Sequence, residues 1–240
     1  MLPNMQTDVT GRQLIKLVSE TGKLPSDFDT TRQQALNRKM TQDEIVEYHV
    51  VINTVSDPEK RTRLLNEWIP KPHVLYHVSA NGNIAEFTPM PSPRTKEESD
   101  TVFAGTTKAV CSMFGIKSAE IKSGSYDGGK TQTVIVGNPK EFLDNDHGGF
   151  LYTLPTESFG VNPNLGLGLS EWTSTKPVKP NNVEHFDSSI QFMLNSGVKI
   201  IPANAEIMRK LRDPSVDDLS VLKDLTPIKT IDELKAIAGI

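Results

Sequence analysis

The spacing of apolar residues along the chain changes once, near residue 70. In residues 1–70 apolar side chains recur at helical spacing, and polar residues mark two helix starts. Thr41 and Glu44 have the spacing of a capping box, and Asp57 followed by Pro58 puts an acid and a proline at the positive end of a helix dipole. These residues are predicted to form a helical N-terminal subdomain.

Residues 71–202 have a different pattern, in which short runs of apolar, β-branched and aromatic residues alternate with turn residues. Strands are predicted at residues 73–79, 101–105, 131–137, 149–154, 171–175 and 198–201. Helices are predicted at residues 107–114 and 187–195, and turns at residues 124–129 and 160–169. Strands with a few helices packed beside them indicate an α+β core.

Residues 203–240 return to helical spacing. Helices are predicted at residues 204–212 and 216–225, and Thr230 with Glu233 marks the start of a last one. The predicted organisation is therefore a helical subdomain at residues 1–70, an α+β core at 71–202, and a helical C-terminal extension at 203–240.

Charge and composition exclude several classes of protein. The formal net charge of −4 provides no overall attraction to a phosphate backbone, so no strong nucleic-acid signature is present. The single cysteine, Cys111, lies in an apolar run and is predicted to belong to the core, and no Cys/His cluster has metal-site spacing. Without an apolar run that would span a bilayer or a signal-peptide pattern, we expect no membrane contact and a cytoplasmic location.

Two titratable residues far apart in the sequence are the main candidates for chemistry. His77 lies at the end of a mostly apolar strand, where one ring nitrogen is free to meet a ligand hydroxyl while the other binds backbone. Glu171 follows a glycine-rich segment and opens a strand, where a carboxylate stabilises positive charge building up at an anomeric carbon. The alternatives are a histidine packed in the core and a solvated acid at a strand end.

Three short motifs resemble the ADP-ribosyltransferase fold of the His-Tyr-Glu type. They are Tyr76-His77-x-Ser79, the run Val102-Phe103-Ala104 before a helix, and Glu171-Trp172. The group includes diphtheria-toxin-like enzymes, poly(ADP-ribose) polymerases and small rifamycin ADP-ribosyltransferases. The resemblance covers about residues 73–180 and implies a split β-sheet core with helical N-terminal and C-terminal additions.

The resemblance also implies roles for residues of the first motif. His77 matches the histidine that binds the adenosine ribose, and Val78 matches the position whose backbone binds the nicotinamide amide. Ser79 matches the small hydroxyl residue that follows. Separately, the guanidinium of Arg94 suits the oxygens of a pyrophosphate.

For the other motifs, the resemblance implies a nicotinamide site and a catalytic acid. Phe103 matches the aromatic residue of the family's aromatic-alanine pair, whereas Val102 stands where the family often has a stacking tyrosine. Phe114 resembles the second stacking aromatic residue. Glu171 matches the catalytic glutamate, which contacts the nicotinamide ribose and stabilises the transition state.

Together these features predict an NAD-dependent ADP-ribosyltransferase-like protein, with NAD as substrate and an acceptor, a protein among the candidates, that the sequence does not identify. A catalytically degraded interaction or binding module on the same scaffold is the alternative, because the family tyrosine is replaced by Val102. A phosphotransferase acting on a 2′-phosphorylated RNA end is a third hypothesis, although it requires a basic cleft that this acidic chain does not indicate.

Overall fold

The structure is a computed structural model that describes residue 52 and residues 57–69, 71–91, 100–118, 120–126, 131–161, 171–213 and 215–240. The helices predicted before residue 52 lie outside the described residues, as does Arg94. The chain divides into two compact units. One comprises Met1–Lys71 and Gly160–Leu169, and the other comprises Pro72–Phe159 and Ser170–Ile240.

The smaller unit contains helix α4 (Pro58–Trp68) and the short strand β6 (Gly160–Val161). The Asp57 side chain accepts hydrogen bonds from the first backbone N–H groups of α4, and Pro58 follows at its first turn. This confirms the predicted helix start. The side chain of Asn66 accepts a hydrogen bond of 3.1 Å from the Val161 backbone N–H, which ties β6 to α4.

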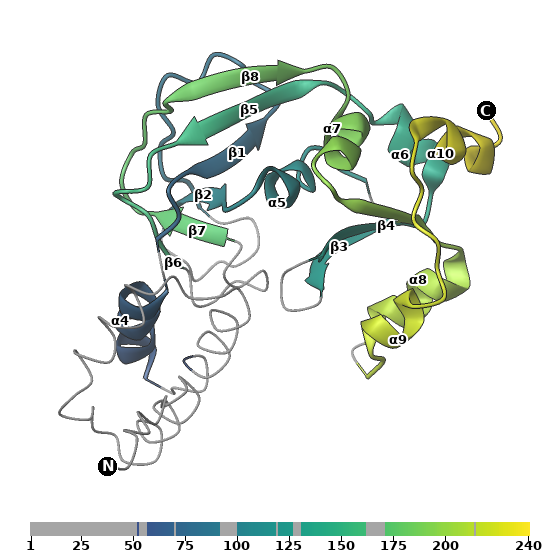
Figure 1. Cartoon of the computed structure of the whole chain (residues 1–240), viewed down its shortest axis with the longest axis horizontal. Coiled ribbons are helices and arrows are strands. Elements are labelled where there is room, and N and C mark those ends of the chain that lie inside the picture. Colours follow the sequence, from purple (N-terminus) through teal and green to yellow (C-terminus); the bar gives the residue numbers. More distant parts are fainter. Residues whose placement is uncertain are drawn as a thin grey trace, which may run out of the picture. The chain divides into compact units, whose positions relative to one another are not determined.

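The larger unit contains two sheets, and the first is antiparallel throughout (Figure 1). Its strands lie side by side in the order β7 (Glu171–Ser174), β2 (Val102–Gly105), β1 (Leu75–Ser79), β5 (Gly149–Leu154) and β8 (Asn182–Phe186). One face holds an apolar core that includes Leu75, Leu154 and Trp172, each almost fully buried. The opposite face is less completely covered, and it carries the candidate site.

The second sheet has the strand order β3 (Ile121–Tyr126), β4 (Thr131–Val136) and β9 (Lys199–Pro202). β4 pairs with β3 antiparallel and with β9 parallel. Because side chains alternate along a strand, Val134 and Val136 pack into one core while Ile135 packs into another on the opposite side. Burial on both faces explains the apolar run Val134-Ile135-Val136 at the end of β4.

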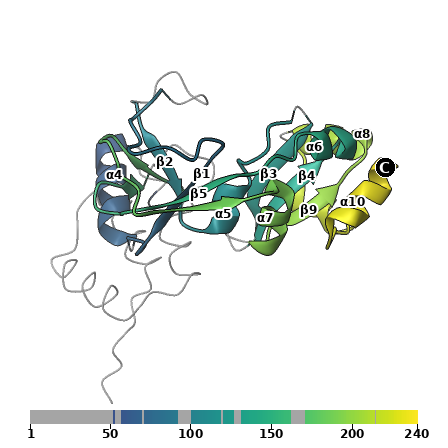
Figure 2. The same ribbon diagram turned by 90° about the horizontal axis from the view of Figure 1, so that it is seen from above.

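Short helices cover the second sheet and connect it to the first. Helices α5 (Lys108–Ser112) and α7 (Ser189–Asn195) lie between the two sheets in both views (Figure 1, Figure 2). α5 contacts β1, β2 and α7, and α7 contacts β9. The remaining helices of this unit are α6 (Pro139–Asp144), α8 (Ala205–Arg212), α9 (Asp218–Leu222) and α10 (Ile231–Ala238).

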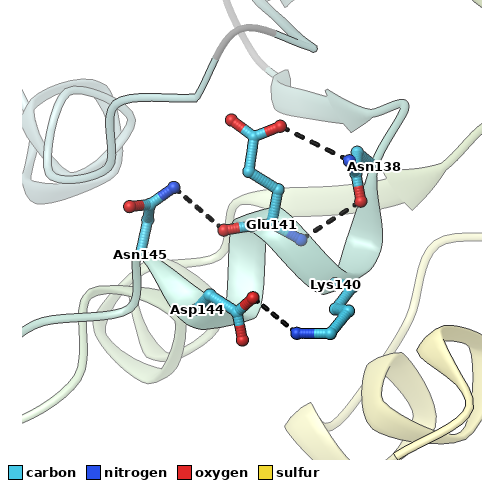
Figure 3. A network of polar contacts seen from close by, with 5 residues as sticks. All are labelled: Asn138, Lys140, Glu141, Asp144 and Asn145. Carbon is cyan, nitrogen blue, oxygen red and sulfur yellow. Dashed lines mark hydrogen bonds and ion pairs between the residues drawn. The ribbon is translucent and has the colours of Figure 1, made fainter.

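Helix α6 has a well-defined polar frame, shown in Figure 3. Asn138 caps its start by accepting a hydrogen bond of 3.1 Å from the Glu141 backbone N–H, and Pro139 begins the first turn. Asn145 closes its end by donating to the Glu141 carbonyl at 3.0 Å. Lys140 and Asp144 form an exposed ion pair one turn apart. Such exposed pairs contribute little to stability, so the caps define this helix.

The mixed α+β class is confirmed, and several predicted elements differ in detail. The predicted turn at residues 124–129 is wrong at its start, because residues 124–126 belong to β3 and pair with β4. β8 and α6 were not predicted. The predicted C-terminal extension, residues 203–240, lies within the larger unit, where Met208, Leu211 and Leu234 contribute to the two cores of the second sheet. The ADP-ribosyltransferase-like core stays a prediction.

A glycine fixes how closely α5 approaches the first sheet. A Cβ atom added at Gly105 would lie 2.5 Å from the Cys111 Sγ and 3.0 Å from the Val110 Cγ1. We therefore expect Gly105→Ala to lower the free energy of unfolding by about 1–3 kcal/mol, the usual cost of overpacking, as measured by urea denaturation.

The companion variant Cys111→Ala removes the closest atom of this clash. We expect the double variant to be more stable than the sum of the single effects by at least about 0.5 kcal/mol. Gly137→Ala is the control, because its added Cβ would meet Met208, in the second sheet's core, instead. Strict additivity of Gly105→Ala with Cys111→Ala would contradict this packing.

Candidate functional site

The first sheet is nearly interrupted between β1 and β2. β1 pairs with β5 from Leu75 to Ser79, and β2 pairs with β7 along its whole length. In contrast, β1 and β2 pair only at Tyr76 and Gly105 among the described residues. Backbone groups beyond this pair need other partners. His77 provides one, since its Nδ1 lies 2.8 Å from the Phe103 carbonyl oxygen.

A pocket of about 140 Å³ opens beside this junction. It is lined by residues of β1, β2, β7 and the α5 region, namely Tyr76, His77, Val78, Phe103, Ala104, Gly105, Val110, Cys111, Phe114 and Glu171. The pocket is close in size to a cavity of ~150 Å³ that accommodates benzene. It therefore has room for one aromatic ring, and anything larger must extend outside.

The sheet register decides which side chains face the pocket's side of the sheet. Glu171 pairs with Gly105, and Gly105 pairs with Tyr76. Directly paired residues of an antiparallel sheet share a face, so the side chains of Tyr76 and Glu171 lie on the same face. α5 packs against this face, because a Cβ at Gly105 would point at Cys111. We call it the site face.

His77 alternates with Tyr76 and therefore projects its ring to the opposite, core face. Its strand partner there is Tyr152, which is buried to 1% exposure. Both rings contact Phe87, with centroid distances of 4.7 Å for His77 and 5.0 Å for Tyr152. The structure thus brings the chain segments of His77 and Glu171 to one pocket, while their side chains lie on opposite faces of the sheet.

The environment of His77 favours its neutral form. Burial lowers the pKa of the ring, and the hydrogen bond to the Phe103 carbonyl opposes this shift only in part. Because a carbonyl oxygen only accepts, the Nδ1 atom carries the proton in this contact. The ring therefore acts as a neutral donor that holds β1 and β2 together where their backbone ladder stops.

Glu171 and Cys111 are neighbours on the site face. Glu171 is only 4% exposed, and Cys111 is equally buried. Burial raises the pKa of the Cys111 thiol to about 12, a hydrogen bond from Gly105 opposes this, and the negative charge of Glu171 adds to the increase. The thiol donates to the Tyr76 carbonyl at 2.9 Å. The prediction that the Cys111 side chain is buried in the core is confirmed, and the thiol also borders the pocket.

The other predicted site residues are placed as follows. Phe103 and Phe114 line the pocket with Val78, and the Phe114 side chain is 41% exposed. Ser79 is not among the described lining residues, and its hydroxyl accepts a hydrogen bond from the Asn81 backbone N–H. Val102, at the position where the family often has tyrosine, lies on the core face at 4% exposure.

Sequence reasoning missed Tyr76 as a site residue. The sequence shows that neighbouring residues of β1 alternate between two faces. His77 was predicted as the site residue because its imidazole is the more reactive group. Which of the two faces is covered depends on the pairing of β1 with β5 and on the position of Phe87, both of which are tertiary features.

A second, open hollow of about 560 Å³ adjoins the first, because Phe114 lines both. Its wall includes Glu141 of α6, which accepts a hydrogen bond of 3.0 Å from the Ser118 hydroxyl. Phe114 therefore stands between a small, mostly apolar pocket and a wider, partly polar one.

Two other kinds of site are absent from the described part of the chain. No three His, Cys, Asp or Glu side chains gather there as a metal site requires. None of the helices in those ranges is both long enough and apolar enough to cross a bilayer. Comparison with protein-family models, curated proteins and solved structures finds no match to this chain.

The lowered pKa of His77 predicts a pH-dependent stability. Below the ordinary value of 6.5 the unfolded chain takes up a proton that the folded ring resists, so the free energy of unfolding falls as the pH is lowered through this window. We expect His77→Gln, which keeps a donor for Phe103, to remove up to about 1.4 kcal/mol per pH unit of this slope.

Urea denaturation between pH 7.5 and pH 5 measures this slope for the wild type and the variant. His185→Gln is the matched control, since His185 lies on the exposed strand β8 and its replacement leaves the His77 contact intact. A slope that is the same in the wild type and in His77→Gln would contradict the buried, neutral state of His77.

Proposed function

We propose that this protein is an NAD-dependent ADP-ribosyltransferase-like protein that transfers ADP-ribose to an acceptor still to be identified. One observation carries the proposal: a buried carboxylate, Glu171, and an exposed aromatic ring, Phe114, line one ring-sized pocket at the junction of β1 and β2. This is where a split-sheet fold of this kind would hold the nicotinamide end of NAD, and the resemblance of the three motifs points to the same place.

In the proposed reaction the bond between the ribose C1′ atom and the nicotinamide nitrogen breaks, and its electron pair leaves with nicotinamide. Positive charge develops at C1′, and the carboxylate of Glu171 stabilises it. The acceptor then forms a bond to C1′ and gives up its proton. Because Glu171 is shielded from water, its interaction with this charge is stronger than it would be at the surface.

The remaining pocket residues would position the substrate. Phe103 and Phe114 offer aromatic faces for the nicotinamide ring, and the backbone of Val78 borders the pocket where the ladder between β1 and β2 has stopped. The ring of His77 faces the core, so its part in this proposal is to set the spacing of β1 and β2 through Phe103.

A binding module on the same scaffold is the second candidate, and two placements favour it. The family histidine has its ring on the core face, and Val102 replaces the family tyrosine at a buried position. The first placement packs the His77 ring against Phe87, and the second removes a ring that would stack on nicotinamide, while the pocket itself is kept. A module of this kind would bind a ligand without turnover.

Glu171→Gln tests the catalytic proposal. The amide keeps the shape of the side chain but loses its charge, so we expect nicotinamide release from NAD to fall at least about tenfold, the scale of one lost transition-state contact. Release is measured by chromatography of the reaction products. Glu184→Gln is the matched control, because Glu184 is exposed on β8 and is absent from the pocket wall.

A thermal-shift measurement with millimolar NAD distinguishes the two candidates. The transferase requires a rise in Tm for the wild type that is reduced in Phe114→Ala, together with nicotinamide release. A rise in Tm without release in any condition would contradict the transferase and support the binding module. The absence of both a shift and release would contradict the proposed use of NAD altogether.

A further inference from the structure

Tyr76 and Glu171 flank one glycine in a row that crosses three strands. Tyr76 pairs with Gly105, and Gly105 pairs with Glu171, so the two side chains rise from the same face about 10 Å apart, two strand spacings. Gly105 contributes no side chain between them. The buried Cys111 thiol lies over its backbone instead.

The aromatic rings on this face come from three separate elements. Tyr76 belongs to β1, Phe103 to β2, and Phe114 follows α5, and all three line the pocket. Phe103 shares the face of Tyr76 and Gly105, because it is two residues from Gly105 along β2. Aromatic faces carry partial negative charge and attract cations.

The charge of the pocket has the same sign. Glu171 is an acidic lining residue, Cys111 remains a neutral thiol, and the described lining residues include no lysine or arginine. A flat ring that enters this pocket meets aromatic faces and a shielded carboxylate. A positive charge on that ring is therefore stabilised, whereas a neutral ring gains only the apolar contact.

We propose that Tyr76, rather than His77, is the residue of β1 whose side chain contacts the ligand, and that with Glu171 it makes the pocket selective for a planar aromatic cation. The identity of that cation rests on the proposed function, in which it is the pyridinium ring of oxidised NAD. Tyr76 thereby supplies the aromatic wall that Val102 does not provide, because Val102 lies on the core face.

Paired probes of similar shape test this inference on the full chain. Isothermal titration compares 1-methylnicotinamide, a planar cation, with nicotinamide, its neutral counterpart. We expect the cation to bind the wild type at least about tenfold more tightly, on the scale of a desolvated cation–π contact together with a nearby carboxylate. Equal affinities, or no binding of either probe, would overturn the proposal.

Variants assign the contribution of each side chain. Tyr76→Leu is expected to weaken binding of the cation about five- to thirtyfold and to do so more than His77→Gln, while Tyr76→Phe keeps the ring and most of the affinity. Glu171→Gln is expected to reduce the preference for the cation over the neutral probe. Phe150→Leu is the matched control, because Phe150 is a half-buried aromatic residue of the first sheet, outside the pocket.

Each variant's thermal melt shows whether it folds. Where Tyr76→Leu does not fold, the comparison of the two probes on the wild type and on Glu171→Gln still tests the proposal. A smaller loss in Tyr76→Leu than in His77→Gln would overturn the assignment to Tyr76. Selective binding of 1-methylnicotinamide without nicotinamide release from NAD would support this inference and contradict the transferase. Nicotinamide release from NAD with equal affinity for both probes would support the transferase and contradict this inference.

Discussion

The candidate site of the larger unit is built around a single backbone pairing, that of Tyr76 in β1 with Gly105 in β2. The other neighbouring strands β1–β5, β2–β7 and β5–β8 are paired along most of their length, so β1 and β2 form the least paired junction of these five strands. Because Gly105 has no side chain, α5 packs directly on the junction. The ring of His77 donates a hydrogen bond to the Phe103 carbonyl of β2, beyond the paired residues. The pocket lies beside this junction, where residues of both strands and of the α5 region line it.

The same junction separates the two faces of the sheet into different environments. On the core face, burial keeps the His77 ring neutral between Phe87 and the Phe103 carbonyl. On the site face, burial keeps the Cys111 thiol protonated. A low effective dielectric suppresses charge on both groups and strengthens the field of the charge that remains. Glu171 lies beside Cys111, and its negative charge adds to the increase in the pKa of the thiol.

Sequence patterns identified the elements whose local signals agree with their burial. β5 was predicted with its observed bounds, Gly149–Leu154, because it is a central strand with a nearly continuous apolar run. β8 was missed because it is an exposed edge strand, where pairing with β5 rather than apolar alternation makes the strand. β3 was mistaken in part for a turn because Gly124 lies between two serines, and its strand form comes from β4.

One missed element had a usable local signal. Asn138, Pro139 and Glu141 form a helix-start pattern of capping residue, first-turn proline and acid three residues on, and all three have these positions in α6 (Figure 3). The helix has only six residues, too few for a full apolar face to register as a period. Caps therefore carry more information than periodicity for the short helices of this fold.

The sequence predicted several of the residues that belong to the candidate site, but not on which face of the sheet each side chain lies. Glu171 and Phe114 were identified from the motifs, and both line the pocket. Tyr76 and His77 are neighbours in a predicted strand, and neighbouring side chains of a strand lie on opposite faces of the sheet. The core face is identified by Phe87 and Tyr152, whose rings contact each other, and the His77 ring packs against Phe87 there. These contacts link residues far apart in sequence, so no local pattern of β1 contains them.

The neighbouring residues His77 and Tyr76 of β1 therefore lie in different environments on the two faces of the sheet. A neutral imidazole packed among rings costs little to bury once its Nδ1 proton has an acceptor, and it makes the separation of β1 from β2 reproducible. On the other face, the Tyr76 hydroxyl forms no hydrogen bond to a side chain or backbone group of the described residues, and Tyr76 contributes to the pocket wall. In the proposed site, His77 therefore supports the spacing of the two strands, Tyr76 contacts the ligand, and Glu171 provides the negative charge that favours a cation.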